Sequence, residues 1–328
     1  MLAVCVCCCG TWVAVDFLPG YLQRQSGELS QNDLTFDVSR DGKYIVFAAD
    51  GKGYRDLYLL SRESGQIQAL TSSDGLERQP SFSHDGKQIA FKRGIVGELV
   101  EQLCVMDIAS GRVTQMTDKV QNVSTPTFSN DGKSVIFALE TKYVPKVNVS
   151  TWKGSGQLTS LDLRTKKQTK LVPEPREAAW PTVSSNGRYL AWKEFSGISV
   201  APVNQPRSYR LLASKGSNPT FSADGKQVAY VTGKYIPDFH VEIVSIEGGE
   251  PVIVPNTDAA MQVKFLPNGR ILVLREFWRK GGFGLPSRAV WEIGVDGTGA
   301  KEVITEAMFS DPLGREATSK TSYGAQNP

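Results

Sequence analysis

The stretch Ser39-Arg40-Asp41-Gly42-Lys43 decides the fold, because similar stretches recur along the chain. Three further copies keep the pattern Ser-x-Asp-Gly-Lys, at residues 83–87, 129–133 and 222–226, and two looser copies at 184–188 and 266–270 carry Asn-Gly-Arg. Asp-Gly and Asn-Gly accept the positive φ angles of a tight two-residue hairpin turn, so each copy is predicted to join two antiparallel strands. The predicted turn residues are Asp41, Gly42, Asp85, Gly86, Asp131, Gly132, Asn186, Gly187, Asp224, Gly225, Asn268 and Gly269.

The segments on both sides of each turn have the pattern of buried strands. A short apolar run follows every copy, as in Tyr44-Ile45-Val46-Phe47, and Pro-x-Phe precedes three of the copies. The six turn glycines lie 38 to 55 residues apart, close to the roughly 40–50 residues of a four-stranded propeller blade. A second pair of strands fits each interval, for example 57–60 and 67–71 on either side of Gly65. The sequence therefore predicts an all-β, six-bladed β-propeller with four antiparallel strands per blade.

The repeated unit resembles a known family. Pro-x-aromatic-Ser-x-Asp-Gly-Lys, followed by a strand, a second strand ending near Met106-Asp107, a glycine turn and an ending such as Met116-Thr117, resembles the TolB-type, WD-repeat-like propeller. The resemblance covers residues 30–306 and implies one folded domain, although the length of 328 residues alone would suggest two. We do not expect TolB itself, whose additional amino-terminal α/β domain has no counterpart in the residues ahead of the first blade. The resemblance implies an extracytoplasmic, typically bacterial scaffold that binds envelope proteins or extracellular ligands.

Both ends of the chain differ from the repeats. Residues 1–15 are uncharged and apolar, so 1–20 are interpreted as a truncated signal peptide or, through Leu2-Ala3-Val4-Cys5, as a lipoprotein anchor that would attach the protein to a membrane. The alternatives are an extra propeller strand, for which 11–18 would serve, and an incorrectly assigned start codon. We expect a periplasmic, membrane-anchored or secreted protein of the bacterial cell envelope. The tail 307–328, rich in Ser, Thr, Gly and Lys, is predicted to be disordered.

The sequence predicts no metal or other cofactor. Four of the five cysteines, at 5, 7, 8 and 9, match no zinc-binding pattern, and Cys104 alternates with apolar residues as a buried thiol would. Each Asp-Gly turn offers one carboxylate, whereas calcium takes six to eight oxygen ligands.

The sequence gives little support for catalysis. Of the two histidines, His84 falls in a turn and His240 at the start of a strand, and no Gly-x-Ser-x-Gly elbow occurs. One alternative is an enzyme that processes a polysaccharide or small molecule with carboxylates at the channel mouth, where Glu77, Glu177 and Asp258 are candidates. Another is a propeller relative of the prolyl-oligopeptidase-like enzymes without their hydrolase domain, because only about twenty residues follow the last strand.

Loop lengths indicate one binding face. Connections between second and third strands share one edge of the propeller with the blade-to-blade connections, and the long basic and aromatic loops all fall there. The leading function is a non-catalytic, monomeric scaffold that binds a protein or an acidic glycan; the net charge of +3 is too small to predict nucleic acid. The alternative role of these side chains is to cap the blades. The candidate binding residues are Arg93, Lys142, Tyr143, Trp152, Lys153, Arg176, Trp180, Tyr235, Trp278, Arg279, Lys280 and Phe283.

Overall fold

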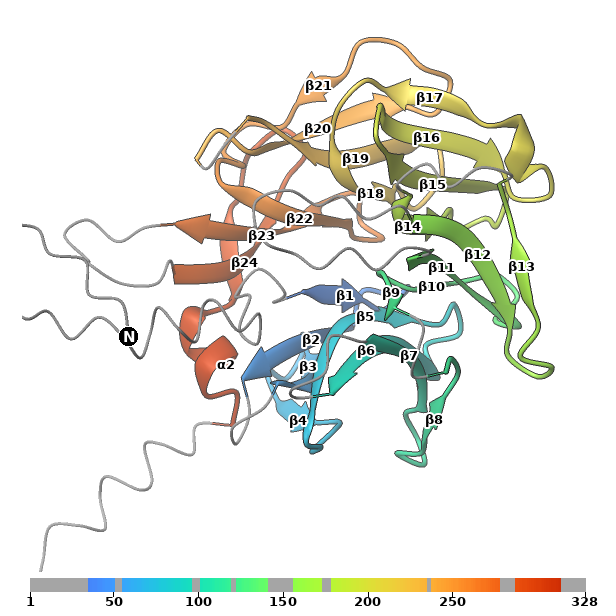
Figure 1. Ribbon diagram of the computed structural model, residues 1–328. Coiled ribbons are helices and arrows are strands. Elements are labelled where there is room, and N and C mark those ends of the chain that lie inside the picture. The colour runs from blue at the N-terminus through green and yellow to red at the C-terminus, as the bar shows by residue number, and fades with distance from the viewer. Residues whose placement is uncertain are drawn as a thin grey trace, which may run out of the picture. The chain divides into compact units, whose positions relative to one another are not determined.

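The computed structural model describes residues 35–50, 55–95, 101–118, 122–140, 156–172, 178–234, 237–277 and 287–313. Six antiparallel sheets follow one another in chain order, and their colours in Figure 1 run from blue through green and yellow to red. The sheets form a six-bladed propeller, and each blade is built from consecutive strands. The predicted fold is confirmed.

The first three blades contain thirteen of the 25 strands in the described residues. Blade 1 comprises β1 (Phe36–Val38), β2 (Tyr44–Asp50), β3 (Arg55–Ser61) and β4 (Ile67–Ala69). Blade 2 comprises β5 (Gly75–Phe82), β6 (Gln88–Ile95), β7 (Glu101–Asp107) and β8 (Val113–Gln115). Blade 3 comprises β10 (Thr127–Phe128), β11 (Ser134–Glu140), β12 (Gly156–Asp162) and β13 (Gln168–Lys170), and the short β9 (Asn122–Val123) also pairs with β11.

The remaining blades repeat the same order. Blade 4 comprises β14 (Ala179–Val183), β15 (Tyr189–Glu194), β16 (Gly197–Pro202) and β17 (Arg210–Ala213), with a 3-10 turn, η2 (Pro206–Ser208), before β17. Blade 5 comprises β18 (Ser217–Phe221), β19 (Gln227–Thr232), β20 (His240–Ser245) and β21 (Val252–Ile253). Blade 6 comprises β22 (Ala260–Phe265), β23 (Ile271–Phe277), β24 (Ser287–Ile293) and β25 (Lys301–Ile304).

The repeated turns join the first and second strands of each blade, but they are not two-residue turns. In the first copy the Ser39 N–H donates to the Tyr44 carbonyl at 2.9 Å and closes a loop of four residues. Gly42 adopts a φ of +73°, whereas Asp41 keeps a negative φ. The Asp41 carboxylate accepts from the Ser39 hydroxyl at 2.7 Å and from the Lys43 N–H at 3.0 Å. The expected two-residue turn is therefore wrong, because the aspartate caps the loop with its side chain.

The apolar runs after the turns are the second strands, and they are buried between blades. Ile45, Val46 and Phe47 of β2 are each 0% exposed. Val46 packs with Phe91 and other side chains of blade 2, while Phe47 packs with blade 6 and Phe309. Alternate residues of one strand thus serve the two interfaces of a blade, as the period of two along a strand requires.

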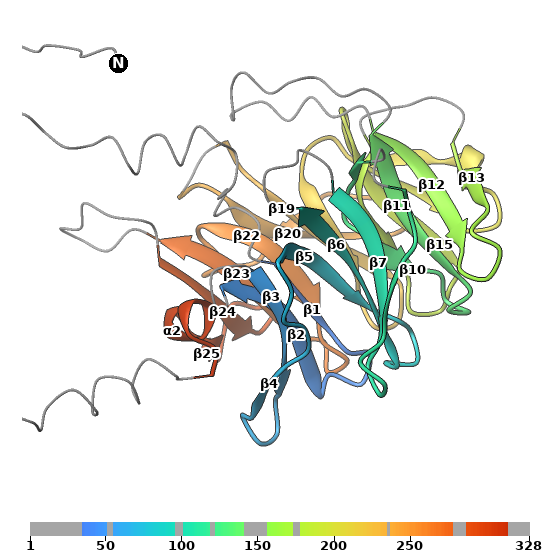
Figure 2. The ribbon, with the colours of Figure 1, turned by 60° about the horizontal axis from the view of Figure 1, so that its bottom comes forward.

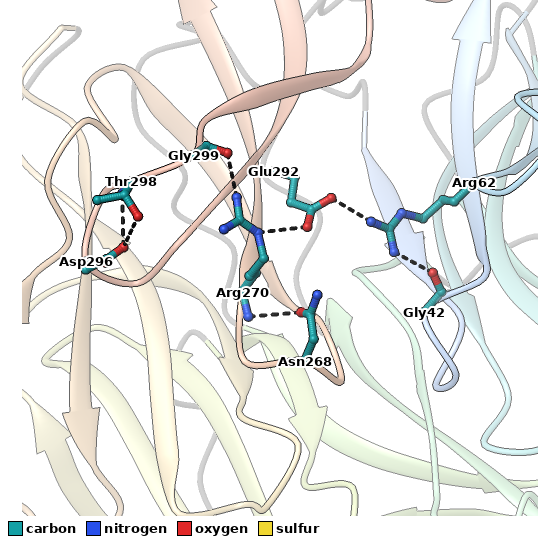
Figure 3. A network of polar contacts seen from close by, with 8 residues as sticks. All are labelled: Gly42, Arg62, Asn268, Arg270, Glu292, Asp296, Thr298 and Gly299. Carbon is teal, nitrogen blue, oxygen red and sulfur yellow. Dashed lines mark hydrogen bonds and ion pairs between the residues drawn. The ribbon is translucent and has the colours of Figure 1, made fainter.

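Blade 6 contains its own fourth strand, β25, and side chains join this blade to blade 1. Figure 3 shows Glu292 of β24 between two arginines. Arg62, after β3, donates to Glu292 at 2.6 Å and to the Gly42 carbonyl at 2.6 Å, while Arg270 donates to the other carboxylate oxygen at 2.8 Å. A strand at 11–18 lies outside the described residues.

The start of the predicted disordered tail is instead a helix, α2 (Glu306–Ser310). Thr305 caps its amino terminus by accepting from the Met308 N–H. Phe309 is 4% exposed and meets Phe47 edge to face, with ring centroids 5.8 Å apart. Figure 2 shows α2 beside β24 and β25. The disorder prediction is wrong for 307–310, because burial of one aromatic ring outweighs the polar composition; residues 314–328 lie outside the described part.

Candidate functional site

The first strand of every blade lines a central channel, which has a cavity at each end. These strands all start at the edge where second strands lead to third strands, named here the loop edge, and they end at the repeated turns, the turn edge. The cavity toward the loop edge, named the neck, measures about 30 Å³ and has room for about one water molecule. The cavity toward the turn edge, named the turn-side cavity, measures about 300 Å³.

One uncharged side chain from each blade surrounds the neck. This neck ring consists of Thr35, Gln79, Thr125, Trp180, Asn218 and Gln262. The backbone at Gln79, Trp180 and Asn218 has φ angles of 52°, 46° and 51°, and the ladders of β5, β14 and β18 shift register there. A proline follows each of these three residues, and residues before proline prefer extended backbone, so the neck ring stores strain.

Two polar atoms of the neck ring are buried without a hydrogen-bond partner among the described residues. They are Oε1 of Gln79 and Oγ1 of Thr125. The Gln79 backbone N–H donates to the Thr35 hydroxyl at 2.8 Å, and the Asn218 amide donates to the Met261 carbonyl at 3.0 Å. A buried acceptor without a donor costs about 1–3 kcal/mol, so the neck is suited to a water molecule or a donor from a bound partner.

A second ring lies two residues further along each inner strand, where the neck meets the turn-side cavity. It is named the hydroxyl ring and consists of Asp37, Ser81, Thr127, Thr182, Thr220 and Lys264. Lys264 pairs with Asp37 at 2.9 Å, and Asp37 also accepts from the Phe82 N–H at 2.8 Å. The charges of this ring therefore cancel, and four hydroxyls remain.

The repeated unit matches one protein family. The model of the TolB β-propeller domain matches residues 23–193 of this chain, which is more than half of its length. The chain belongs to the TolB β-propeller family. The predicted resemblance is confirmed.

Individual relatives and solved structures are similar to this TolB-type propeller in sequence and in fold. The Tol-Pal system protein TolB of Francisella tularensis subsp. holarctica (strain OSU18) is 27% identical over 252 residues, which are 75% of this chain and 54% of the relative. The chain thus spans about half the length of the curated relatives it matches. TolB from Acinetobacter baumannii superposes with a TM-score of 0.62 at 20% identity, over 79% of this chain and 63% of that structure.

The same fold also occurs in an enzyme. Oligogalacturonate lyase from Vibrio parahaemolyticus gives a TM-score of 0.57 at 14% identity, over 84% of this chain and 80% of that structure. At this level of identity the likeness shows the fold alone, because one fold hosts many activities.

Two of the candidate binding residues lie in the described part of this TolB-type propeller. Trp180 belongs to the neck ring. Arg93 of β6 donates to Oε1 of Glu77 at 3.0 Å through Nε and at 2.5 Å through Nη2, and Glu77 is 0% exposed. Arg93 is therefore held by an internal ion pair. The other ten lie outside the described residues: Lys142, Tyr143, Trp152, Lys153, Arg176, Tyr235, Trp278, Arg279, Lys280 and Phe283.

The candidate acidic groups do not converge. The carboxylate of Glu77 is paired with the guanidinium of Arg93. At Asp258 the backbone carbonyl accepts a hydrogen bond from Arg275 Nε at 2.8 Å. Glu177 lies outside the described residues. Nowhere in the described ranges do three His, Cys, Asp or Glu side chains gather in a way that could hold a metal ion. None of the helices described there has the length and apolar composition of a membrane span.

The two histidines lie in different blades. His240 of β20 contacts Glu242 at 3.4 Å, and the Tyr230 hydroxyl donates to Glu242 at 2.7 Å. Burial and the hydrogen bond to Glu242 raise the pKa of Tyr230. His84 lies at the turn edge, where its Nδ1 is 3.1 Å from the Arg40 guanidinium. Burial lowers the pKa of His84, and the charge of Arg40 lowers it further.

Sequence reasoning missed Phe195 and most of the neck ring. Phe195 lies in the turn between β15 and β16 at the loop edge, and it is 84% exposed. A single aromatic residue in a two-residue connection does not stand out beside long basic loops. The x-Pro pairs that precede the aromatic strand residues were a usable signal for the neck ring, because they recur in register from blade to blade.

Proposed function

We propose that this TolB-type propeller is a non-catalytic, extracytoplasmic scaffold of the bacterial cell envelope that binds a protein partner through its loop edge. The neck ring carries the proposal, because Gln79 and Thr125 present buried polar atoms without partners in a ring that also contains Trp180. A segment of the partner that reaches the neck supplies the missing hydrogen-bond donor. Relatives named as proteins of the Tol-Pal system support a role in the envelope.

Aromatic side chains support the choice of this edge. Tryptophan is enriched among the residues that dominate binding energies at interfaces, and Trp180 lies at the neck. Phe195 lies in the neighbouring hairpin of blade 4 and adds an exposed apolar ring to the loop edge. Loops on a rigid scaffold are where binding residues concentrate, and all six blades hold this edge in place.

The test compares capture of partners by the full chain and by a Trp180→Asn variant. Asparagine tolerates a positive φ, and Asn218 occupies the corresponding place in blade 5, so the variant is expected to fold. Proteins captured from a cross-linked envelope extract are identified by mass spectrometry, and the purified partner is then titrated against each variant. We expect Trp180→Asn and Phe195→Ser each to weaken its binding about tenfold or more, which corresponds to roughly 1.4 kcal/mol.

The control is Val252→Asn, which introduces the same residue at an exposed position of the outermost strand β21. Equal binding by all variants, with unchanged thermal stability, would rule out the loop edge as the docking face. The same titration with Trp278→Ala and Arg279→Ala tests the loop prediction for residues outside the described part.

A further inference from the structure

The turn-side cavity lies at the other end of the channel from the proposed docking face. Its volume of about 300 Å³ falls in the range of small-molecule sites. The hydroxyl ring forms its floor, and one residue from each repeated turn lies at its rim. The rim residues are Arg40, His84, Asn130, Ser185, Ala223 and Pro267.

Positive charge remains in this cavity after its internal ion pairs are formed. Lys264 and Asp37 neutralise each other at 2.9 Å in the floor. The turn carboxylates do not line the cavity, because each is bound within its own loop; Asp85, for example, accepts from the Ser83 hydroxyl at 2.7 Å. Arg40 forms no ion pair with a carboxylate among the described residues, so none of the described carboxylates compensates its charge at the rim.

The cavity also offers hydrogen-bond donors that have no acceptor among the residues that the structure describes. The hydroxyls of Ser81, Thr127, Thr182 and Thr220 form no hydrogen bond with other described residues. By contrast, the repeated serines are fully engaged, since Ser83 donates to Asp85 and accepts from the Gln88 N–H at 2.9 Å. Four free hydroxyls below an arginine are suited to a ligand with several oxygen acceptors.

Arg40 and His84 form a pair that an anion can bridge. Arg40 Nη1 lies 3.1 Å from His84 Nδ1, which accepts only when the imidazole is neutral. The other charged group that acts on His84 is Asp85 of its own loop. A carboxylate between the two side chains would accept from the guanidinium fork and from the protonated imidazole. Proton uptake by His84 therefore accompanies binding of an anion.

We propose that the turn-side cavity binds a carboxylate-bearing ligand of small-molecule size, with Arg40 and His84 holding the carboxylate at the rim and the hydroxyl ring holding further oxygens. Arg40 and His84 lie at the turn edge, at the other end of the channel from the loop edge. Nothing in the proposed scaffold function requires this site.

The experiment uses the two histidines as reporters. The imidazole protons of the full chain are followed by NMR from pH 4.5 to 8.5, with and without citrate at constant ionic strength. A nearby anion favours the charged imidazole, so citrate is expected to raise the pKa of His84 and to leave that of His240 unchanged. Arg40→Gln is expected to weaken citrate binding at least tenfold.

The matched control is Lys43→Gln, which removes one positive charge from the same loop without changing the rim of the cavity. An equal loss of citrate affinity in both variants would mean that citrate responds only to the overall positive charge of the turn edge, and the proposal would be overturned. A shift of both histidines, or of neither, would overturn it as well.

Three further ligands distinguish the source of the carboxylate. Succinate, trigalacturonate and a triglutamate peptide are compared with glucose, which carries hydroxyls but no charge. Any of the three acids shifting His84 at lower concentration than citrate identifies the preferred source, and a shift by glucose alone would contradict a carboxylate site. Trp180→Asn is expected to leave citrate binding unchanged, so failure of the docking proposal and failure of this one are separable.

Discussion

The side-chain amide of Gln262 in β22 forms two hydrogen bonds with the backbone of Phe36 in β1. Its Oε1 accepts from the Phe36 N–H at 3.1 Å, and its Nε2 donates to the Phe36 carbonyl at 2.8 Å. The two residues lie 226 positions apart, at the seam where the last blade meets the first. A glutamine thus takes over, at this seam, the pairing that a neighbouring strand would give.

Replacing Gln262 with leucine should therefore destabilise the ring. Phe36 is 0% exposed, so its N–H and carbonyl would lose their partners in a buried place. At about 1–3 kcal/mol for each of these two groups, we expect the free energy of unfolding to fall by roughly 2–6 kcal/mol. Urea-induced unfolding measures this change. Gln68→Leu, on the exposed face of β4, is the control and should change stability by less than about 0.5 kcal/mol. Equal effects would show that the seam is not closed by this amide.

The Phe309→Ala substitution tests whether α2 belongs to the folded propeller. The ring of Phe309 packs on Phe47 in a cluster shared by blades 1 and 6. Truncation of a buried phenylalanine costs about 3–5 kcal/mol, and we expect a value near the lower limit, because α2 follows the last strand and can reposition. Thermal and urea unfolding report the change. Ser310→Ala, at an exposed position of the same helix, should be nearly neutral; a similar small loss for Phe309→Ala would mean that the helix contributes little.

The repeated turns predict how stability depends on pH. Hydrogen bonds from the preceding serine hydroxyl lower the pKa values of Asp41, Asp85, Asp131 and Asp224. Because its pKa is lower in the folded state, each aspartate stabilises the fold above the unfolded pKa of about 3.9. This stabilisation is lost as the pH falls through the folded pKa. Unfolding should therefore become easier as the pH falls below about 4.

A variant with asparagine at all four positions should lose part of this acid sensitivity. The fold accepts the change, because Asn186 already makes the same bonds, accepting from Ser184 at 2.8 Å and from the Arg188 N–H at 3.0 Å. Urea midpoints between pH 2.5 and pH 7 give the comparison. We expect similar midpoints at pH 7 and a flatter profile below pH 4. An unchanged profile would assign the acid sensitivity to other carboxylates.

Cys104 should be nearly unreactive in the native state. The thiol is 1% exposed, and burial raises its pKa to about 11, so at pH 8 only about one thousandth is thiolate, the reactive form. Alkylation with iodoacetamide, followed by mass spectrometry of the peptide that contains Cys104, should be at least tenfold slower in the native protein than in guanidinium chloride. Equal rates would indicate that β7 opens readily.

Local features explain why the fold could be predicted. Asp-Gly and Asn-Gly pairs with apolar runs beside them mark each hairpin independently, and their spacing gives the number of blades. The same features misled on the turn type, because the dipeptide shows where glycine adopts a positive φ but not that Asp41 bonds to Ser39. The polar composition of the tail also predicted disorder where α2 forms, because the one buried ring of Phe309 holds this segment against the propeller.

The candidate sites could be predicted only in part. Trp180 was among the binding candidates because it is an aromatic residue in a blade-to-blade connection. Arg93 is a candidate because the sequence places it in a basic loop between second and third strands, but it lies in β6, where Glu77 of the neighbouring strand β5 pairs with its charge. No local pattern marks Arg40 and His84 as neighbours, since they are 44 residues apart in the chain.

The sequence by itself determined the strands, the turns and the six blades, because turn chemistry and the period of two act over a few residues. Only the tertiary structure decided which side chains meet in the channel and at the seam. Gln79 and Gln262 come to line the same cavity, and Phe36 and Gln262 become neighbours, when six blades close around one axis. That closure depends on packing between blades that are far apart in the chain, and no short stretch of sequence contains it.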